Sequence, residues 1–355
     1  MKTFLLVNEN GSDNIGDHAI NEGLKALLSE AGCNYVSEPY STTHTAPEGS
    51  NADESVSPTL SQKLRKTLFK FKPFYLLMWL LKHKGRIKQS CSGNYDGIII
   101  GGGQLILSGA AFPPALYAWA RYAKKNKIPL YLLGVGCGEH FHRSETWLIS
   151  KALTTTTRIC VREHESVVKL DNYFTANAEF CPDLAFGLQP IVGQETRKGL
   201  MVGMTDYAVF KRYRHEVSAP KVESYQEYLT VWYDKVLAMH TPGTPIVLAS
   251  TTHTDAQCNR DLYQRLSASA VSADVRLIDG VLPLEAYRRE LSVIDTVFSG
   301  RMHSLILGKI EGAAIQPWVI SKKIENFLGL YADKDIIELK TQLQGIVREI
   351  GAHGE

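Results

Sequence analysis

Short apolar runs alternate with helical patterns along most of the chain. The first run, Thr3–Val7, is continuous and is followed by turn residues, as in strands that both faces of a parallel sheet bury. The next apolar residues fall on one face of a helix, at Ile20, Leu24, Leu27 and Leu28. Asp17 is placed to cap this helix and Gly32 to end it. The pattern therefore predicts a βα unit at the start of the chain.

The same alternation continues in two series. The first predicts strands at Tyr95–Ile100, Pro129–Val135 and Arg158–Val161. Residues 187–198 have linker composition, and after them we expect strands at Gly199–Met204, Ile246–Ala249, Val275–Ile278, Leu291–Phe298 and Ile315–Ile320. The sequence therefore predicts an α/β protein with two Rossmann-like domains facing across a cleft. The predicted parts are residues 1–190, residues 198–333 and a C-terminal helix and tail at 334–355.

Composition excludes several classes of protein. The 39 basic residues nearly balance the 37 acidic ones, for a formal charge of +2, so no general attraction to nucleic acid is expected. The six cysteines include no CxxC pair, which favours reduced thiols over a disulfide framework or a zinc site. The first residues turn polar too early for a signal peptide, and no stretch reaches the ~20 apolar residues that span a bilayer. We expect a cytoplasmic protein.

Residues 63–88 depart from this balance, because they contain many cations and no acidic residue. Aromatic and aliphatic side chains are interleaved with the cations. This mixture is typical of an amphipathic helix that lies on an anionic membrane surface. We predict that the segment docks the protein peripherally on the inner face of the cell membrane. The alternative is one or two ordinary helices that pack on the core and expose a solvated basic face.

The turn Ser299-Gly300-Arg301-Met302-His303-Ser304 is the strongest candidate for a site. It lies between the predicted strand Leu291–Phe298 and a helical pattern that starts at Leu305. The first backbone N–H groups of a helix have no partner within the helix and favour an anion. Arg301 adds a fixed positive charge, and His303 adds a group that titrates near neutral pH. We expect a small acid with a carboxylate or a phosphate to bind here.

Other candidate residues follow the first two predicted strands of the chain. Asp13 and Asp17 come after the first strand, where open α/β sheets bind ligands, although both could be only turn and cap residues. Gly102 and Gly103 follow Tyr95–Ile100 and let the backbone approach a ligand or a facing loop closely.

Arg162 follows the strand Arg158–Val161 and is a further candidate for anion binding. The alternative is a structural ion pair with a nearby glutamate, Glu163 or Glu165. His140 and His142 lie in a loop without a third metal-ligating residue in view, so we interpret them as surface residues and predict no metal site.

Five short motifs occur in a fixed order between residues 1 and 332. They are Asn14-Ile15-Gly16-Asp17-His18-Ala19-Ile20, Ile99-Ile100-Gly101-Gly102-Gly103-Gln104-Leu105, Val161-Arg162-Glu163-His164-Glu165-Ser166, Cys181-Pro182-Asp183 and the 299–304 turn. Together they resemble the polysaccharide pyruvyl transferase family. The loop Gly134–Gly138 departs from the GxGxGP form that this family often has, and the basic aromatic insertion is larger than usual.

The resemblance implies a two-domain fold similar to GT-B glycosyltransferases. It also implies an enzyme that moves the enolpyruvyl group of phosphoenolpyruvate onto two hydroxyls of one sugar, giving a pyruvate ketal in a cell-surface polysaccharide precursor. Phosphoenolpyruvate would be the donor substrate, and no separate cofactor is expected. The basic insertion suggests that the acceptor is a lipid-linked oligosaccharide.

The resemblance also implies roles for the candidate residues. His303 would donate the proton that activates the donor, and Arg301, Arg162 and Lys323 would hold the phosphate and carboxylate, with Ser299 in the same binding turn. The other candidates, Asp13, Asp17, Gly102 and Gly103, would face the acceptor.

Two other functions remain open at this point. A glycosyltransferase of the same fold would use Arg301 and Lys323 to hold the diphosphate of a nucleotide sugar. A membrane-associated scaffold in a polysaccharide assembly complex would bind no small anion and would not need His303.

Overall fold

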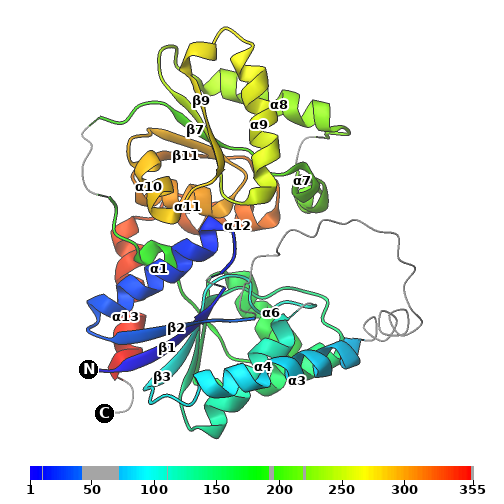
Figure 1. Cartoon of the computed structure of the whole chain (residues 1–355), viewed down its shortest axis with the longest axis vertical. Coiled ribbons are helices and arrows are strands. Elements are labelled where there is room, and N and C mark those ends of the chain that lie inside the picture. Colours follow the sequence, from blue (N-terminus) through cyan, green and yellow to red (C-terminus); the bar gives the residue numbers. More distant parts are fainter. Residues whose placement is uncertain (10, 42–71, 110, 192–195, 219–220, 353–355) are drawn as a thin grey trace. The chain divides into compact units, whose positions relative to one another are not determined.

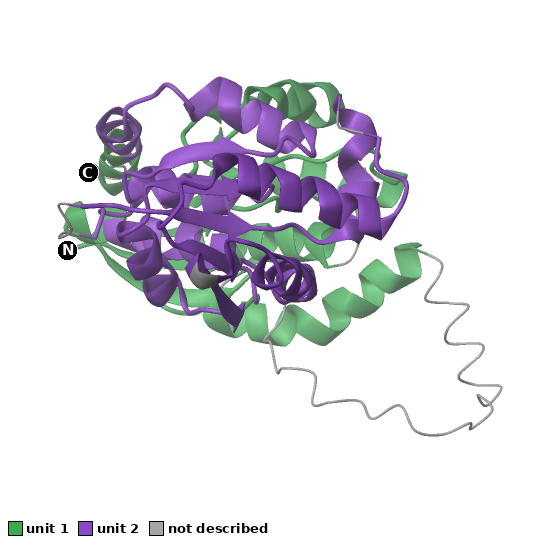
Figure 2. Cartoon of the chain, turned by 90° about the horizontal axis from the view of Figure 1, so that it is seen from above, with its two compact units in different colours: residues 1–12, 27–184, 344–355 green, residues 13–26, 185–343 purple. Residues whose placement is uncertain are grey.

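The computed structural model describes residues 1–9, 11–41, 72–109, 111–191, 196–218 and 221–352. The chain forms two compact units, which Figure 2 shows in different colours. Unit 1 comprises Met1–Ser12, Leu27–Leu184 and Gln344–Glu355, and unit 2 comprises Asp13–Ala26 and Ala185–Leu343. Residues 13–26 thus belong with the second half of the chain, and residues 344–355 with the first. The sequence-based boundaries at 190 and 334 do not separate these two segments.

Unit 1 contains a parallel sheet of six strands (Figure 1). The strands are β1 (Thr3–Asn8), β2 (Asn34–Pro39), β3 (Gly97–Gly101), β4 (Leu130–Val135), β5 (Arg158–Val161) and β6 (Glu179–Phe180). They pair in the order β2-β1-β3-β4-β5-β6, and every neighbouring pair is parallel. The winding direction reverses between β1 and β3, which is where open α/β sheets bind ligands at their carboxyl edge.

Four helices of unit 1 cover one face of this sheet. They are α3 (Lys72–Ser90), α4 (Phe112–Lys125), α5 (Arg143–Leu153) and α6 (His164–Phe174). Neighbours in this list contact each other, and right-handed crossovers between parallel strands place all four on the same side. The core lies between this layer and β3 and β4, where Ile98, Ile100, Leu130 and Leu132 are at most 1% exposed.

Unit 2 contains a parallel sheet of five strands in the order β11-β10-β7-β8-β9. The strands are β7 (Leu200–Gly203), β8 (Ile246–Ser250), β9 (Val275–Val281), β10 (Thr296–Ser299) and β11 (Ala314–Pro317). The helices are α7 (Tyr207–Tyr213), α8 (Tyr225–Met239), α9 (Ala256–Ser267), α10 (Leu284–Ser292), α11 (Met302–Ile310) and α12 (Lys322–Tyr331). The winding of this sheet reverses between β7 and β10.

Two long helices are divided between the units. Helix α1 (Ile15–Glu30) begins in unit 2 and ends in unit 1, and helix α13 (Ile336–Ala352) does the same. Within unit 1, Glu349 of α13 pairs with Arg158 of β5 at 2.7 Å. The apolar spacing predicted for α1 is confirmed, since Ile20 and Leu24 are at most 2% exposed.

An aromatic cluster forms part of the core of unit 2. Its members are Phe210, Tyr228, Trp232, Phe298 and Trp318, with ring centroids 4.6 Å apart for Trp232 and Trp318 and 4.7 Å apart for Trp232 and Phe298. The hydroxyl of Tyr228 donates a hydrogen bond to the carbonyl of Thr205 at 2.8 Å. The cluster therefore packs against β10 through Phe298 and holds the loop after β7 through the hydroxyl of Tyr228.

The predicted strand Leu291–Phe298 is wrong in its first half. Leu291 lies in the last turn of α10, and the strand begins only at Thr296. Tyr287, Arg288 and Leu291 are all buried at helical spacing, and the apolar residues on both sides of Asp295 hid this change from helix to strand. The strand β2 was missed because its residues are exposed or only half-buried at the edge of the sheet.

The predicted cap of α1 is also wrong. The helix begins at Ile15, and the Oδ1 of Asn14 accepts a hydrogen bond from the N–H of Gly16 at 3.0 Å. Asp17 lies in the first turn instead. There a carboxylate interacts favourably with the positive end of the helix dipole without being the cap.

The predicted docking segment 63–88 is described only in part. Residues 63–71 lie outside the described residues, and α3 contains the remainder. Leu76, Trp79 and Ile87 of α3 are buried, so one face of this helix packs on the core, as the alternative interpretation expected. In the part of the chain that the structure describes, no helix has the length and apolar content needed to cross a membrane.

Glu145 of α5, with only 1% exposure, connects three segments of unit 1. Its carboxylate accepts hydrogen bonds from the N–H of His142 at 2.8 Å, the hydroxyl of Ser108 at 2.7 Å and the N–H of Gly109 at 2.8 Å. The Nζ of Lys72 lies 3.2 Å away. Burial raises the pKa of Glu145, but these hydrogen bonds lower it more, so that its pKa is below the ordinary value of 4.5.

We expect Glu145→Gln to destabilise unit 1 by about 1–3 kcal/mol at pH 7, because an amide leaves buried donors without an acceptor. The depressed pKa means that the contribution of the carboxylate is present above pH 4.5 and is lost as the pH falls through the folded pKa. Urea unfolding should therefore show a difference between wild type and variant that is largest at neutral pH and shrinks in acid. Glu139→Gln, whose side chain is 46% exposed, is the control and should show a much smaller effect. A difference that does not depend on pH would contradict this account.

Candidate functional site

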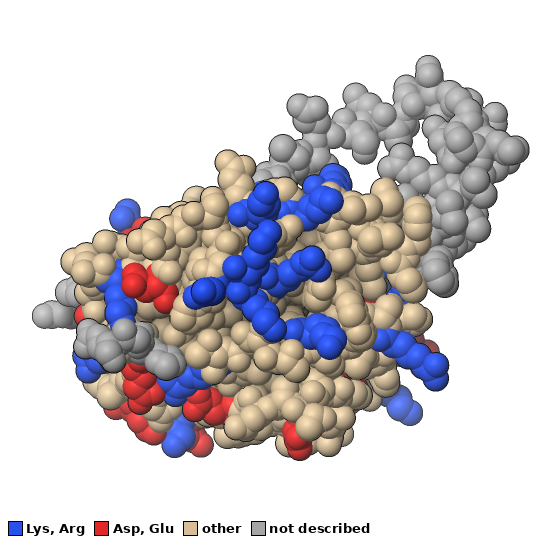
Figure 3. Space-filling view, turned by 90° about the horizontal axis from the view of Figure 1, so that it is seen from below, with Lys and Arg blue, Asp and Glu red and all other residues tan. Residues whose placement is uncertain are grey.

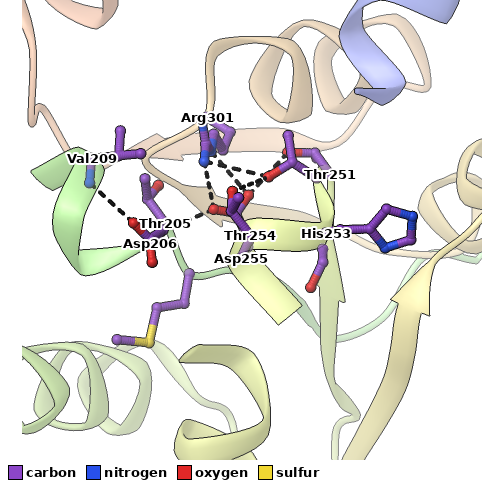
Figure 4. A network of polar contacts seen from close by, with 12 residues as sticks. Thr205, Asp206, Val209, Thr251, His253, Thr254, Asp255 and Arg301 are labelled. Atoms are coloured by element: carbon purple, nitrogen blue, oxygen red, sulfur yellow. Dashed lines mark hydrogen bonds and ion pairs between the residues drawn. The ribbon is translucent and has the colours of Figure 1, made fainter. Parts of the chain in front are cut away.

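Three loops at the carboxyl edge of the unit 2 sheet come together around Arg301 (Figure 4). They follow the adjacent strands β10, β7 and β8. The 299–304 turn follows β10, Thr205 and Asp206 follow β7, and Thr251–Asp255 follows β8. The site therefore lies where the winding of the sheet reverses, which is the usual position of a ligand in this architecture.

The loops after β7 and β10 contact each other very closely. The hydroxyl of Ser299 donates to the carbonyl of Gly203 at 2.9 Å and accepts from the N–H of Arg301 at 3.0 Å. A Cβ atom on Gly203 would lie 2.8 Å from the Oγ of Ser299, and one on Gly300 would lie 2.6 Å from the Oγ1 of Thr205. Ser299 is fully buried. Its hydroxyl thus fixes the turn that carries Arg301.

Asp255 holds the side chain of Arg301 through two hydrogen bonds. The Nε of Arg301 donates to one carboxylate oxygen at 2.9 Å, and Nη2 donates to the other at 2.6 Å. Asp255 is 1% exposed, whereas the side chain of Arg301 is 24% exposed. A two-point contact of this kind fixes the plane of the guanidinium as well as its position.

The carboxylate of Asp255 is itself held by the surrounding loops. It also accepts the N–H of Asp206 at 2.9 Å and lies 3.5 Å from the hydroxyl of Thr251. Asn259 is fully buried one turn further along α9, and its amide bonds the backbone N–H and carbonyl of Met204, both at 3.1 Å. The loops after β7 and β8 are therefore positioned around one carboxylate.

Arg301 occupies the position just before helix α11, whose first turn contains His303. An arginine side chain has no hydrogen-bond acceptor, so it cannot cap the first N–H groups of the helix. These N–H groups and the guanidinium together favour a negatively charged ligand. The geometry thus supports the prediction that a small acid binds at this turn.

His303 lies against the start of helix α1. It is 8% exposed, and a Cβ atom on Gly16 would lie only 2.1 Å from its Nδ1. The start of α1 is in turn tied to the loop after β8, because the N–H of Ile15 donates to the carbonyl of Thr251 at 3.0 Å. Asp13 accepts the N–H of His253 at 3.1 Å. The imidazole is therefore enclosed by backbone that leaves no room for a side chain at position 16.

Helix α11 is anchored to α10 by a buried pair of hydroxyls. The hydroxyls of Tyr287 and Ser304 lie 2.8 Å apart. Burial raises the pKa of Tyr287 to about 12, so the phenol stays neutral and can hydrogen-bond to the serine. This contact fixes the turn of the helix that also carries His303.

The remaining predicted residues of unit 2 lie at the starts of helices. Lys323 is half-buried in the first turn of α12, and the N–H of its neighbour Lys322 donates to Glu216 at 3.2 Å. Asp17 is in the first turn of α1, and Asp13 is exposed just before that helix. Their substrate-binding roles stay predictions.

Arg162 belongs to unit 1 and forms a buried ion pair. Its Nη1 lies 2.7 Å from the Oδ2 of Asp183, and the exposures of the two side chains are 2% and 1%. Nε lies 3.5 Å from Glu163, the glutamate that the sequence offered as one alternative. The contact connects two of the sequence motifs. Because the charge of Arg162 is already balanced, its proposed contact with the donor stays a prediction.

Gly102 and Gly103 lie where the loops after β3 and β4 meet in unit 1. Their φ angles are +67° and +74°, which only glycine adopts without strain. The N–H of Gly102 donates to the carbonyl of Leu133 at 2.7 Å, and the carbonyl of Gly103 accepts the N–H of Gly136 at 2.8 Å. The facing loop that these glycines approach is thus the one after β4. An additional role in acceptor binding stays a prediction.

The structure therefore brings Arg301, His303 and Ser299 together, and adds residues that the sequence analysis did not single out. The main additions are Asp255 and Gly16. Asp255 ends a polar loop behind a predicted strand, and Gly16 is the glycine of the first motif. The position of each residue in the sequence was therefore compatible with a place near a site. Within the described ranges, no group of three or more His, Cys, Asp or Glu side chains is arranged to hold a metal ion.

Comparison with solved structures defines the class of fold. UDP-GlcNAc 2-epimerase from Methanocaldococcus jannaschii aligns over 99% of both chains at 10% identity, with a TM-score of 0.50. The enzyme from Neisseria meningitidis, solved with UDP-GlcNAc bound, aligns over 99% of this chain and 98% of its own, again at 10% identity and a TM-score of 0.50. The predicted α/β fold with two Rossmann-like domains of the GT-B type is confirmed.

A sequence comparison then gives the family. The profile of the polysaccharide pyruvyl transferase family matches residues 14–310, so the chain belongs to this family. The match includes the start of α1, the 299–304 turn and the loops around Asp255. No curated protein matches the sequence.

We expect Asp255→Asn to lower activity about 10²-fold, because an amide cannot accept both hydrogen bonds of Arg301 and the guanidinium loses its fixed position. If the site binds a small acid as predicted, the loss should appear mainly as weaker binding of that acid, and Asp255→Glu should restore part of it. Steady-state kinetics with a thermal unfolding curve separates this effect from loss of folding. Asp279→Asn breaks an exposed pair with Arg260 in the same unit and should leave the kinetics unchanged. Equal kinetics for the Asp255 and Asp279 variants would refute the positioning role.

We expect Gly16→Ala to displace the imidazole of His303, since the new methyl group would overlap the ring. Overpacking of this kind costs about 1–3 kcal/mol of folding stability. Activity should fall in parallel with a change in the NMR signals of His303. Gly329→Ala is the control, because nothing lies within 4 Å of this helical position, and it should stabilise unit 2 slightly. Unchanged histidine signals in the Gly16 variant would show that the contact is not close in solution.

Proposed function

We propose that the protein transfers the enolpyruvyl group of phosphoenolpyruvate to two hydroxyls of a sugar in a polysaccharide precursor and forms a pyruvate ketal. The observation that carries this proposal is the two-point contact between Arg301 and the buried Asp255, directly before the helix that carries His303. Family membership supports the transferase class, and the geometry supports binding of an anion beside an imidazole.

Phosphoenolpyruvate suits this arrangement because it carries two acidic groups on a three-carbon unit. The exposed part of the Arg301 guanidinium is our candidate contact for one of them, and the positive end of the α11 helix dipole lies directly behind this residue. Lys323, in the first turn of α12 of the same unit, is our candidate for a second cationic contact. Arg162 of unit 1 is a further candidate, and its ion pair with Asp183 would then orient it.

His303 is our candidate for the general acid. A protonated imidazole gives its proton to the methylene carbon of phosphoenolpyruvate, and the double bond becomes a methyl group beside a cationic carbon. The first sugar hydroxyl adds to that carbon and returns a proton to the imidazole. The C–O bond to phosphate then breaks, and the second hydroxyl adds and loses its proton to the departing phosphate. The products are the ketal and inorganic phosphate, so atoms and charges balance.

The acceptor side and the location belong to the same proposal. The acceptor is a sugar of a lipid-linked oligosaccharide, and the protein works in the cytoplasm at the inner face of the membrane. Asp13 and Asp17 at the start of α1, and Gly102 and Gly103 after β3, remain our candidates for acceptor contacts. The exposed cations and apolar side chains of α3 support an association with the membrane.

We expect phosphoenolpyruvate to stabilise the protein against thermal unfolding by about 2.7 kcal/mol at a concentration 100 times its Kd. Arg301→Ala should abolish this stabilisation. His303→Gln should keep the stabilisation but lower product formation by about 10²–10⁴, the usual contribution of general acid catalysis. The exposed residues Arg289 and His215 of unit 2 provide matched controls, and Arg289→Ala and His215→Gln should behave as wild type.

UDP-GlcNAc is the comparison ligand in this experiment, because the Neisseria meningitidis structure contains it. Stabilisation by UDP-GlcNAc and not by phosphoenolpyruvate would favour a glycosyltransferase and would overturn the proposal. Absence of binding by either ligand, with full cellular function of the His303 variant, would instead support a scaffold.

A further inference from the structure

Exposed cations gather on the outer side of the helix layer of unit 1. Figure 3 shows Lys and Arg side chains close together on the face seen from below, where α3 and α4 lie. We name this surface the basic helix face and define it by the following exposed residues: Lys82, Lys84 and Lys88 of α3, Arg121, Lys124 and Lys125 of α4, and Lys127 just behind α4. Four exposed apolar residues, Leu77, Met78, Leu81 and Trp147, belong to the same helix layer.

Helix α3 arranges its exposed residues as an amphipathic strip. Leu77, Met78 and Leu81 are 53%, 38% and 48% exposed. At roughly 100° per residue, Lys84 and Lys82 lie at the two edges of a strip about 160° wide, with these apolar residues between them. The opposite side of the helix, with Leu76 and Trp79, is buried in the core. The apolar strip is therefore additional to the face that folding needs.

Helices α4 and α5 extend the face with an exposed tryptophan. Nη1 of Arg121 lies 3.2 Å from the hydroxyl of Tyr117, and the ring of Tyr117 lies 5.7 Å from that of Trp147. Trp147 is 54% exposed. A tryptophan beside cations is typical of side chains that sit at the level of lipid headgroups, because the ring has an apolar body and a polar N–H.

The basic helix face has almost no acidic residues near it in the sequence. Between residues 72 and 138 the chain contains one acidic residue, Asp96, whose carboxylate accepts the N–H of Thr3 at 2.7 Å. Among the described residues, no carboxylate forms an ion pair with Lys82, Lys124 or Lys125. The positive potential of the face is thus not compensated locally, and it suits an anionic partner.

We propose that the basic helix face docks on the surface of an anionic phospholipid bilayer. The cations attract the lipid headgroups, and the exposed leucines, methionine and tryptophan enter the boundary with the acyl chains. Nucleic acid would satisfy the cations but would leave aliphatic side chains such as Leu77 and Leu81 without a partner. The docking surface includes α4 and α5, whereas the sequence indicated only residues 63–88. This inference deepens the membrane association within the proposed function, but it does not require the proposed reaction.

The test measures binding of the full chain to vesicles of phosphatidylcholine with and without phosphatidylglycerol. Binding should require the anionic lipid and should weaken at high salt. Lys124→Glu/Lys125→Glu should lower the partition coefficient at least about 25-fold, at about fivefold for each of the two cations removed from an anionic surface. Lys211→Glu/Arg212→Glu is the matched control, because these two exposed cations occupy the last turn of α7 in unit 2. The control should bind as wild type.

Trp147 provides a second, local measurement. Of the five tryptophans, Trp147 is 54% exposed, and the other four are at most 6% exposed. Vesicle binding should shift its fluorescence to the blue, and brominated lipids should quench it. Trp147→Phe should remove the shift. Leu77→Ser/Leu81→Ser should weaken the part of vesicle binding that remains at high salt, because this part comes from the apolar side chains.

Three results would overturn the proposal. The first is vesicle binding that is the same for the α4 charge variant and the α7 control. The second is vesicle binding that leaves the fluorescence of Trp147 unchanged. The third is tight, salt-dependent binding of a DNA or RNA oligonucleotide together with no vesicle binding, which would assign the face to nucleic acid. Because none of these measurements uses phosphoenolpyruvate, a failure here is distinct from a failure of the proposed reaction.

Discussion

The buried carboxylate of Asp255 is the constraint on which the candidate site depends. It takes two hydrogen bonds from Arg301, one from the backbone of Asp206 and a weaker one from Thr251, so three loops are positioned around it. A buried carboxylate is costly unless it is paired, and the guanidinium supplies the partner. The same pairing fixes the orientation of Arg301 while a quarter of the arginine side chain stays accessible. The positions of the loops and the partial exposure of the guanidinium thus depend on one contact.

Close backbone contacts complete this arrangement. Gly203 and Gly300 allow the loops after β7 and β10 to touch, and Gly16 allows the start of α1 to lie against His303. Each position would be crowded by a single additional carbon atom. These glycines therefore reflect packing between loops as much as freedom of the backbone, and they allow the imidazole of His303 and the guanidinium of Arg301 to lie at one edge of the sheet.

The fold could be predicted from the sequence because its central strands β1, β3, β4, β7 and β8 are buried along most of their length and appear as apolar runs. The exceptions follow the same rule, since the exposed edge strand β2 has no apolar run and α10 ends inside one. The 299–304 turn could be found from its position after an apolar run. Asp255 could not be recognised as a site residue from the sequence. Its role depends on the contact with Arg301, which lies 46 residues away in the sequence. The extension of the basic helix face onto α4 and α5 depends on packing of helices that the sequence does not reveal.

Analysis of the product formed in D₂O tests the central claim most directly. The protein is incubated with phosphoenolpyruvate and a lipid-linked oligosaccharide, and the product is examined by mass spectrometry and NMR. The account predicts release of inorganic phosphate and a sugar ketal whose methyl group contains one deuterium from solvent, with the yield greatly reduced in the Asp255→Asn and His303→Gln variants. A product that contains a transferred sugar, or a ketal formed equally well by both variants, would contradict it.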